Sequence, residues 1–460
     1  MNILFCIYQL DYADHISLAY LSAVAKKLGH NTNICILSDC DLNDKITSYR
    51  PDIVAYSTNI YGYDHLLASH KAAARKHDFI SIMGGPHVTI YPELYATAEA
   101  DFFCAGEGEL AFAEVLQHIE AGKNCDGVAN IISAQGANPV RPLIMELDEI
   151  PFPDRDLTLA NSYLRDTPKK TFYATRGCPF NCKYCANNFF QELYSGKWSR
   201  IRRFSVNRII DEVHYVKNRY RTDFIKFGDD LFAIKADQWL EEFAERYSKE
   251  IGIPFNCYLR VDRIDRNLLE LLKMAGCYSV HLSVDSTSEH VREKVLGRRM
   301  KKVDIESTLK LVRNYGINTW VNFMLAAPDS TFEDDLSTIE LSKRADVTYP
   351  AFSTTVPMPG TALYDDCLRK GLIKETDNTG DMTGIAEKSM LSCFTEKDKD
   401  ARLNIYLLGA LAAKSPKLLQ RVFLFLIKHI PPNKLFRWMR NKYYVYNIEN
   451  KIFKLNKHTV

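Results

Sequence analysis

The stretch Thr171-Phe-Tyr-Ala-Thr-Arg-Gly-Cys-Pro-Phe-Asn-Cys-Lys-Tyr-Cys185 joins a short apolar segment to a loop that carries Cys178, Cys182 and Cys185. Three and then two residues separate these cysteines, so their thiolates can surround one side of a single metal centre. Three cysteines fill neither a structural zinc site nor all four iron positions of a 4Fe-4S cluster, and one coordination position therefore stays open for chemistry. Structural zinc with a distant fourth ligand such as His214 is the alternative.

Apolar segments follow this loop at regular intervals, with helical periodicity between them. The expected strands cover residues 171–175, 224–227, 254–259, 279–284, 319–325 and 352–356. Strands that alternate with helices predict a parallel sheet. Six such units predict a partial (β/α)6 TIM-type barrel over residues 171–365, with chemistry on the loops at the carboxyl ends of its strands.

The same alternation precedes the loop, and it predicts a doubly wound, Rossmann-like parallel sheet over residues 1–140. Glycines follow two of its expected strands, at Gly84-Gly85 and at Gly106-Glu-Gly108. They allow either the close approach of a ligand to the backbone or only tight turns. Residues 141–170, which include an acidic and proline-punctuated stretch, are expected to form a linker.

Composition sets limits on the function. A chain of 460 residues with 46% hydrophobic and 25% charged residues predicts two folded domains and an appendage. A net charge of +2 argues against a nucleic-acid partner held by bulk electrostatics. The first residues do not resemble a signal peptide, so we expect a cytoplasmic location, where the twelve cysteines do not form a disulfide framework.

Residues 366–460 show only helical periodicity, and from residue 414 onward they are basic and apolar together. This pattern is typical of a helix that lies in a membrane surface, but also of a helix that packs on its own barrel with snorkelling lysines. The region is therefore expected to be helical. If it packs on the barrel it could cover the substrate, and if it lies in a membrane surface it would contact lipid.

The cysteine loop, with Tyr184 just before its last cysteine, resembles the signature of radical S-adenosylmethionine (SAM) enzymes. Three further stretches resemble motifs of that family in the right order. They are Phe227-Gly-Asp-Asp-Leu-Phe232, Ser283-Val-Asp-Ser286 and Val356-Pro-Met-Pro-Gly-Thr361. The resemblance implies that the three cysteines hold a 4Fe-4S cluster and that SAM binds its open iron and is cleaved to a radical.

The resemblance also implies the residues that bind SAM: Tyr184, Asp229, Asp230, Asp285 and, for the carboxylate of SAM, Arg260. Capped helices or surface ion pairs are the alternative for each of them. The chain departs from the family where Ala326-Ala-Pro-Asp-Ser330 replaces a glycine-rich stretch after the fifth strand, and where Asp285 replaces the commoner glutamate. These departures put the adenine contacts in doubt.

Residues 1–140 resemble the cobalamin-binding domain of cobalamin-dependent radical SAM enzymes through residues 51–57, 83–87 and 105–109. The resemblance implies that cobalamin is bordered by Ser57, Gly84, Gly85, Gly106 and Glu107. The chain lacks the Asp-x-His-x-x-Gly loop that places a histidine on cobalt, because Asp14-His15 has neither the spacing nor the glycine. We therefore expect cobalamin to bind with its nucleotide base detached from cobalt and with no protein histidine in its place. The histidines at 15, 65 and 87 are expected to be ordinary polar residues.

The resemblance as a whole implies a methyltransferase class that acts on an unactivated carbon in a biosynthetic pathway. Its expected cofactors are a 4Fe-4S cluster, SAM and cobalamin. Its expected partners are a small-molecule or carrier-bound substrate and an electron donor such as flavodoxin or ferredoxin, without nucleic acid. A radical cyclase or rearrangement enzyme is the alternative, and a non-catalytic corrinoid-binding protein is a third.

Overall fold

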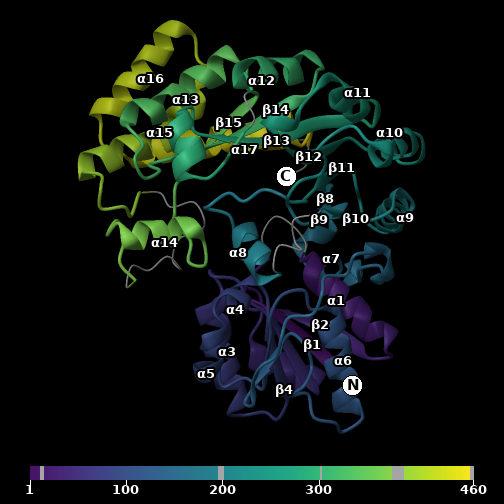
Figure 1. Cartoon of the computed structure of the whole chain (residues 1–460). Helices are drawn as coiled ribbons and strands as arrows, with labels where there is room; N and C mark the ends of the chain where they lie inside the picture. Colours follow the sequence, from purple (N-terminus) through teal and green to yellow (C-terminus); the bar gives the residue numbers. More distant parts are fainter. Residues whose placement is uncertain (11–14, 195–200, 301–302, 376–387, 456–460) are drawn as a thin grey trace. The chain divides into compact units, whose positions relative to one another are not determined.

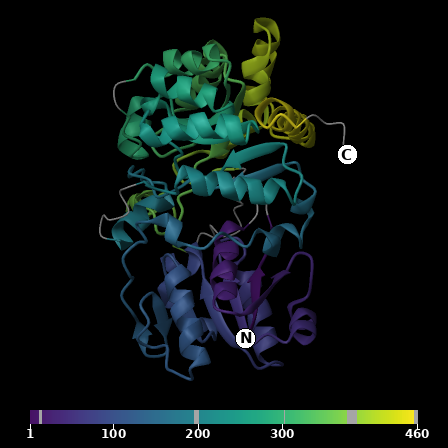
Figure 2. The ribbon, with the colours of Figure 1, turned by 90° about the vertical axis from the view of Figure 1, so that its right-hand side faces the viewer.

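A computed structural model describes residues 1–10, 15–194, 201–300, 303–375 and 388–455. Contacts divide the chain into two compact units (Figures 1 and 2). The first unit consists mainly of Met1–Lys170, together with Asn218–Arg221 and the segment around Tyr194. The second contains Thr171–Phe189 and most of the chain after residue 221.

The first unit is built on a sheet of seven strands in the order β2-β1-β3-β4-β5-β6-β7. Its strands are β1 (Asn2–Ile7), β2 (Asn31–Ile36), β3 (Ile53–Ser57), β4 (Ile80–Gly84), β5 (Phe102–Cys104), β6 (Ile131–Ser133) and β7 (Gly136–Ala137). Its helices are α1 (Ile16–Lys27), α2 (Leu42–Tyr49), α3 (Tyr63–Ala74), α4 (Pro86–Ile90), α5 (Tyr95–Ala98) and α6 (Glu109–Glu120), with the short η1 (Pro92–Leu94). The first five strands pair in parallel, which confirms the doubly wound sheet.

Both faces of this sheet are covered, because side chains alternate along each strand. On β1, Ile3, Phe5 and Ile7 join one apolar cluster with residues of α1 and α6. Leu4 and Cys6 join a second cluster with residues of α2 and α3. The order of the strands reverses between β1 and β3, the place where such sheets bind ligands at the carboxyl ends of their strands.

Two features of the first unit were not predicted. β6 and β7 extend the sheet in antiparallel fashion at the edge beyond β5. Residues 141–170 contain the short helices η2 (Leu147–Glu149), α7 (Arg155–Leu159) and η3 (Tyr163–Arg165).

The second unit is built on a six-stranded sheet in the order β15-β14-β13-β12-β11-β8, which confirms the partial barrel. Its strands are β8 (Lys169–Phe172), β11 (Phe224–Phe227), β12 (Phe255–Arg260), β13 (Cys277–Asp285), β14 (Asn318–Leu325) and β15 (Tyr349–Thr354), beside the small pair β9 (Thr175–Arg176) and β10 (Arg202–Arg203). Its helices are α9 (Val206–Lys217), α10 (Gln238–Glu250), α11 (Arg266–Met274), α12 (Ile305–Asn314), α13 (Phe332–Arg344) and α14 (Ala362–Arg369), with the short turns η5 (Val261–Arg263) and η6 (Val291–Val295); α8 (Ala186–Leu193) follows the cysteine loop.

The two faces of this second sheet differ. On β14, Val321, Phe323 and Leu325 are fully buried and face the outer helices, whereas Trp320 and Asn322, which alternate with them, keep some exposed surface. The outer face is strongly aromatic: Phe227 and Phe255 contact Phe243 of α10 edge to face. The outer face is therefore the packed core, and the inner face is the side that is available for a site.

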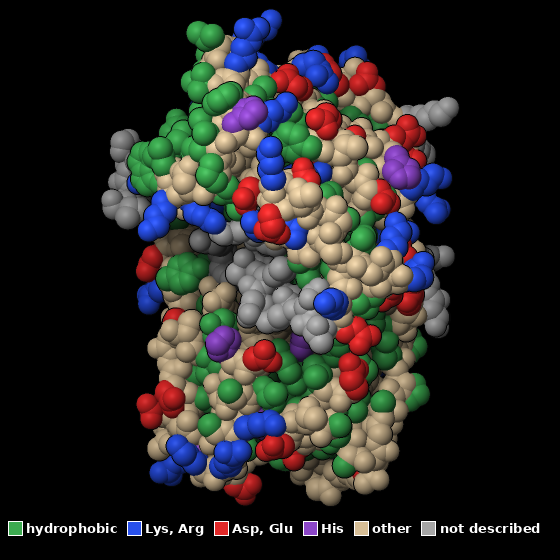
Figure 3. Space-filling view, turned by 90° about the vertical axis from the view of Figure 1, so that its left-hand side faces the viewer, with side chains coloured by type: hydrophobic (Ala, Val, Ile, Leu, Met, Phe, Trp, Pro, Cys, Tyr) green, Lys and Arg blue, Asp and Glu red, His purple; other side chains and the backbone are tan. Residues whose placement is uncertain are grey.

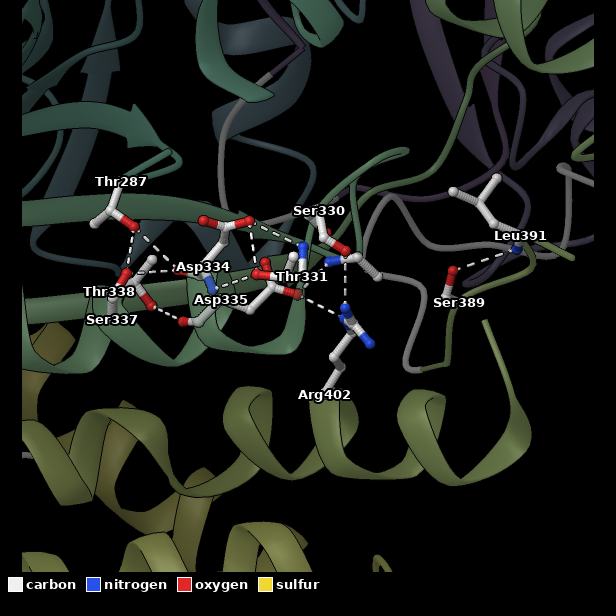
Figure 4. Close-up of polar contacts among 11 residues, drawn as sticks. Thr287, Ser330, Thr331, Asp334, Asp335, Ser337, Thr338, Ser389, Leu391 and Arg402 are labelled. Carbon is white, nitrogen blue, oxygen red and sulfur yellow. Dashed lines mark hydrogen bonds and ion pairs between the residues drawn. The ribbon is translucent and has the colours of Figure 1, made fainter. Parts of the chain in front are cut away.

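Helices α15 (Glu396–Lys414), α16 (Lys417–His429) and α17 (Lys434–Asn447), with η7 (Ile448–Ile452), complete the second unit and confirm a helical C-terminal region. A buried ion pair links α15 to α13: Arg402 Nε lies 2.6 Å from Asp335 Oδ2 (Figure 4). Another Arg402 nitrogen donates to the Ser330 carbonyl at 3.1 Å. No helix within the described ranges is long and apolar enough to cross a membrane.

Candidate cluster, SAM and cobalamin sites

The cysteine loop is held in place by backbone contacts from distant parts of the second unit. Lys183 N donates to Leu296 O at 3.0 Å, and Leu363 N donates to Lys183 O at 2.9 Å. The Lys183 ammonium also pairs with Asp366 of α14 at 2.8 Å. Gly297 has a positive φ of 64°, and a Cβ there would lie 2.8 Å from Lys183 Cγ. The position of the three cysteines is therefore fixed by the fold around them.

The sulfur atoms lie beside hydrogen-bond donors. Arg260 Nη1 is 3.8 Å from Cys182 Sγ, and Asn187 Nδ2 is 3.6 Å from Cys185 Sγ. The Arg260 guanidinium stacks on the Phe180 ring at 3.7 Å from its centroid. Donors of this kind stabilise the negative charge that a cluster places on its thiolates.

Burial raises the pKa of Cys178 to about 12 and that of Cys185 to about 11. Both cysteines are therefore neutral thiols until a metal centre displaces their protons. Among the described residues, no group of three or more His, Cys, Asp or Glu side chains is arranged to hold a single metal ion. A cubane cluster places each thiolate on a different iron, so the cysteines fit a cluster better than a mononuclear zinc site.

Two of the residues expected to bind SAM contact each other. Tyr184 donates from its hydroxyl to Asp285 Oδ2 at 2.6 Å. Arg298 Nη1 donates to the same hydroxyl at 3.0 Å, and Arg298 Nε lies 3.2 Å from the Asp285 carboxylate. All three side chains are largely buried, and they join the cysteine loop to the end of β13. Asp285 therefore holds this loop against the end of β13 through Tyr184.

The other two acidic candidates follow β11 and differ in their surroundings. Asp229 is buried, and its Oδ1 accepts hydrogen bonds from Ala174 N at 2.7 Å and Thr175 N at 2.6 Å. Burial raises the pKa of Asp229 to about 7, and its Oδ2 is buried without a hydrogen-bond partner in the described part of the chain. The Asp230 side chain is accessible to solvent, but the surrounding protein partly desolvates its carboxylate and so raises its pKa. Asp230 and the free oxygen of Asp229 are thus the carboxylate atoms available to a ligand.

Arg260 was expected to bind the carboxylate of SAM, but its donors point elsewhere. Its Nε donates to Asp262 at 2.8 Å and its Nη2 to the Arg299 carbonyl at 3.0 Å. The remaining contact is the one to Cys182 Sγ. The geometry supports a role for Arg260 beside the cluster sulfur more directly than a role on the carboxylate.

The loop after β14, where the chain departs from the family pattern, has an unusual backbone. Ala326 and Asp329 have positive φ angles of 55° and 62°, a conformation that favours glycine. Ala326 N donates to Asp335 Oδ2 at 3.0 Å, the oxygen that Arg402 also contacts. Alanine thus adopts the conformation that glycine would take, and the buried Asp335–Arg402 pair holds it there (Figure 4).

In the first unit, the residues expected around cobalamin lie at the carboxyl ends of β3, β4 and β5. Ser57 Oγ and His15 Nε2 are 3.3 Å apart. Gly85 has a φ of 104°, and a Cβ there would lie 2.4 Å from the Thr58 carbonyl oxygen. Gly84 has ordinary room, with its nearest neighbour at 3.7 Å. Glycine is therefore required at position 85 by the backbone itself.

Gly106 and Glu107, at the end of β5, meet a residue that comes much later in the sequence. Glu107 N donates to the Tyr194 hydroxyl at 2.8 Å. A Cβ at Gly106 would lie 2.3 Å from that same hydroxyl. Tyr194 itself packs in an apolar cluster with Leu143, Val140, Phe190 and Leu193.

The three histidines near this edge each have a neighbour in the first unit. His65 stacks on Tyr8 at 4.4 Å, and His87 lies 4.4 Å from the Tyr63 ring. Burial lowers the pKa of His87 to about 4, which keeps its ring neutral. Asp14 lies outside the described residues, whereas His15 precedes α1 and contacts Ser57.

Arg298, Thr58 and Tyr194 were missed by sequence reasoning. Arg298 and Tyr194 belong to no motif and reach their partners only through the fold. Thr58 directly follows Ser57, and its packing against Gly85 depends on how two parallel strands end side by side.

The cysteine loop and the glycine-lined edge of the first sheet indicate a class of iron–sulfur enzymes. In this class a partial barrel carries the cysteine loop, and a separate Rossmann-like unit carries a second ligand site. The model of the Radical SAM superfamily matches residues 172–342, and that of the B12 binding domain matches residues 11–116. The chain belongs to the cobalamin-dependent radical SAM enzymes. Its cofactors are a 4Fe-4S cluster, SAM and cobalamin.

Relatives of known sequence cover most of the chain. An uncharacterized methyltransferase of Pyrococcus horikoshii is 29% identical over 371 residues, which are 78% of this chain and 79% of the relative. The cytidylyl-2-hydroxyethylphosphonate methyltransferase of Streptomyces wedmorensis is 22% identical over 80% of each chain. The anaerobic magnesium-protoporphyrin IX monomethyl ester cyclase of Rubrivivax gelatinosus is 24% identical over 76% of this chain and 65% of the relative.

A solved structure shares the fold. The radical SAM methyltransferase TsrM from Kitasatospora setae, solved with cobalamin and a [4Fe-4S] cluster bound, superposes with a TM-score of 0.67. The superposition covers 80% of this chain and 75% of TsrM at 16% sequence identity. The arrangement of a B12-type sheet followed by a radical SAM barrel is therefore common to both proteins.

Proposed function

We propose that this enzyme transfers a methyl group to an unactivated carbon of a biosynthetic intermediate. The observation that carries the proposal is the pairing, in one chain, of a cysteine loop with donors on its sulfurs and a sheet that ends in a glycine-lined ligand edge. Relatives named as methyltransferases cover about four fifths of the chain and support the same conclusion.

When bound, the cluster and SAM supply a hydrogen-abstracting radical, and cobalamin supplies a transferable methyl group. The protein residues bind, orient and exclude water. Cys178, Cys182 and Cys185 would hold the cluster, and Arg260 would donate to a cluster sulfur. Asp230 and Asp229 Oδ2 are the carboxylate oxygens that would accept hydrogen bonds from SAM, beside the Tyr184–Asp285 pair.

The residues proposed for cobalamin are those at the carboxyl edge of the first sheet. Ser57, Gly84, Gly85, Gly106 and Glu107 would border the corrinoid and its nucleotide tail. Gly85 contributes by letting its backbone approach that of Thr58, and Gly106 leaves room for the Tyr194 hydroxyl, because a Cβ at either position would collide with these atoms.

The test is the fate of the methyl group of SAM. Reduced, reconstituted enzyme is incubated with deuteromethyl-labelled SAM and a small-molecule extract of its source cells. We expect a product that carries the intact labelled methyl group, together with cleavage of a second SAM molecule. The variant that lacks all three loop cysteines serves as the control, and product in that control or transfer of no label would refute the proposal.

A radical cyclase is the second candidate, because the cyclase of Rubrivivax gelatinosus matches 76% of this chain. A cyclase cleaves SAM without moving its methyl group into the product. A product that has lost hydrogen, and that carries no label from deuteromethyl SAM, would therefore favour this candidate over the methyltransferase.

We further propose that α16 docks the enzyme on an anionic membrane surface. Leu418, Val422 and Phe425 follow helical spacing and are 77%, 48% and 57% exposed. Gln420, Phe423 and Ile427, on the opposite side, are buried. One face of α16 thus packs on the protein, while another stays apolar and exposed, and this exposed face supports the proposal.

Basic residues flank this exposed face. Lys417, Arg421 and Lys428 recur at helical spacing and are exposed. Figure 3 shows apolar side chains gathered in the upper part of the side where α13 to α16 lie, with Lys and Arg side chains around them. An apolar strip beside a basic strip matches the interface of an anionic bilayer, where each basic residue contributes about 1 kcal/mol.

Sedimentation with vesicles tests this docking. We expect the holoenzyme to bind vesicles of phosphatidylglycerol but not vesicles of phosphatidylcholine, and Phe425→Glu to weaken binding by about 10-fold or more. Met274→Glu, at a side chain that is 50% exposed on α11, is the matched control and should bind like the wild type. Equal binding of all three proteins, or self-association through α16 without vesicle binding, would contradict the proposal.

The remaining partners follow from the chemistry of the cluster. We propose that the cluster receives its electron from a flavodoxin or ferredoxin in the cytoplasm, since radical formation begins with a one-electron reduction. Reduction of the enzyme by a purified flavodoxin, followed by SAM cleavage, checks this step.

A further inference from the structure

Four side chains form a layer across the middle of the inner face of the barrel. Tyr258, His281 and Trp320 occupy paired positions on β12, β13 and β14. Their rings stack in a row, with centroids 4.4 Å apart between Tyr258 and His281 and 4.3 Å apart between His281 and Trp320. Lys226 of β11 completes the layer, with its ammonium 5.3 Å from the Tyr258 centroid. We call these four residues the inner layer.

Three buried nitrogens of the inner layer lack a well-formed hydrogen bond in the described part of the chain. Both ring nitrogens of His281 and Nε1 of Trp320 are buried without a well-formed hydrogen bond, although the Asn322 side chain lies near the imidazole. No carboxylate of the described residues lies within ion-pair distance of Lys226. A half-buried cation without a carboxylate partner and buried N–H groups without well-formed hydrogen bonds cost free energy, and native proteins rarely retain them without a purpose.

The polar atoms of Lys226, His281 and Trp320 mainly donate hydrogen bonds. The Lys226 ammonium and the Trp320 indole can only donate hydrogen bonds, and a neutral His281 offers one donor. Burial lowers the pKa of His281 to about 3 and that of Lys226 to about 8, so at neutral pH the first is uncharged and the second is still charged. The layer therefore presents one positive charge and two N–H donors, which complement an anion.

The inner layer lies beside accessible space. Lys226, Tyr258 and Trp320 keep partial exposure, whereas the outward-facing residues on the same strands are buried. The N-terminal side of the layer is closed by the end of the chain: the Phe453 ring lies 6.1 Å from Trp320, and Ser279 donates to the Ile452 carbonyl at 2.6 Å. The opposite side leads along the strands toward Arg260 and Asp285, where the SAM and cluster residues lie.

We propose that the inner layer is a subsite for a carboxylate or phosphate group of the substrate, with Lys226 as its charged anchor and Trp320 and His281 as donors. The subsite would hold the anionic end of the substrate at the closed end of the barrel and leave the rest of the molecule directed toward the radical-generating end. This assignment rests on the proposed function for the identity of the ligand as substrate, but the binding itself is independent of turnover.

Equilibrium binding to the reconstituted holoenzyme tests the proposal. The probes are inorganic phosphate and acetate, measured by calorimetry with and without saturating S-adenosylhomocysteine. A hydrogen bond to a charged group contributes about 1.5–3 kcal/mol, so we expect Lys226→Met to weaken binding by about 10-fold or more. Lys249→Met, at an exposed lysine of α10 that pairs with Glu245, is the matched control and should bind as the wild type does.

The outcomes separate three cases. Anion binding that needs Lys226 and survives S-adenosylhomocysteine supports a substrate subsite. Binding that S-adenosylhomocysteine abolishes would assign the anion to the SAM carboxylate and overturn the proposal, as would binding that is equal in Lys226→Met and wild type. Trp320→Phe keeps an aromatic side chain but removes the indole N–H, so it should weaken anion binding. Cooperative thermal unfolding of this variant would show that it still folds.

Discussion

Replacing Lys226 by methionine should make the ligand-free protein more stable at neutral pH. Burial lowers the pKa of Lys226 from 10.5 to about 8, so the folded state holds an ammonium less favourably than the unfolded chain does. A difference of about 2.5 pKa units corresponds to about 3 kcal/mol at pH 7, an upper value because the side chain keeps partial exposure. Methionine fills similar space and carries no charge.

The sign of the pH dependence follows from the lowered pKa. Below pH 8 both states are protonated and the full penalty applies. Between pH 8 and 10.5 the unfolded chain binds more protons than the folded state, so the stability of the wild type rises with pH. The advantage of Lys226→Met should therefore be largest at pH 7 and should shrink as the pH rises from 8 toward 10.

Urea unfolding followed by tryptophan fluorescence provides the measurement, because three of the four tryptophans, Trp239, Trp320 and Trp438, lie in the second unit. We expect Lys226→Met to unfold with about 1–3 kcal/mol more stability than the wild type at pH 7. Lys249→Met, 69% exposed at its side chain, should change stability by less than about 0.5 kcal/mol. A Lys226→Met variant that is no more stable than the wild type at pH 7, or a gap that widens with pH, would refute the reasoning.

Three further changes test the packing around the sites. Arg402→Leu should lose about 3–5 kcal/mol of unfolding free energy, because it leaves the buried Asp335 carboxylate alone, and Asp335→Leu added to it should recover much of this loss in the same urea titration. Ala326→Gly should gain about 0.5–1 kcal/mol, since its φ of 55° is strained for alanine, and an unchanged midpoint would show that the loop is not strained. Gly85→Ala should lower the cobalamin bound per chain after reconstitution, because its Cβ would lie 2.4 Å from a backbone oxygen, while Gly127→Ala, with no atom within 4 Å of its Cβ, should keep it; equal cobalt content in the two variants would contradict this account.

Local sequence patterns were sufficient to predict those features that residue spacing alone determines. The positions of Cys178, Cys182 and Cys185 in one loop follow from two short intervals, and the parallel order of both sheets follows from alternating strands and helices. Gly85 was recognised from its place after a strand, although its physical reason, a close contact with Thr58, depends on a neighbouring strand.

Contacts between distant parts of the sequence could not be predicted in this way. The partner of Tyr184 and Asp285 is Arg298, which no motif marks and which only the fold brings to them. Phe453 closes the barrel from the end of the chain, more than one hundred residues after Trp320 in the sequence. Arg260 shows the same limit, because only the fold places its guanidinium beside Cys182 Sγ.

The most direct measurement of the central claim is the metal content and the EPR spectrum of the anaerobically reconstituted protein. We predict about four irons and about four sulfides per chain, a reduced-cluster signal that shifts when SAM is added, and one cobalt whose spectrum lacks a coordinated nitrogen. In a variant with alanine at Cys178, Cys182 and Cys185, the iron and sulfide should be lost while the cobalt remains. A wild-type protein with no SAM-sensitive cluster signal, a cysteine variant that keeps its iron, or a cobalt spectrum with a histidine nitrogen would contradict the account.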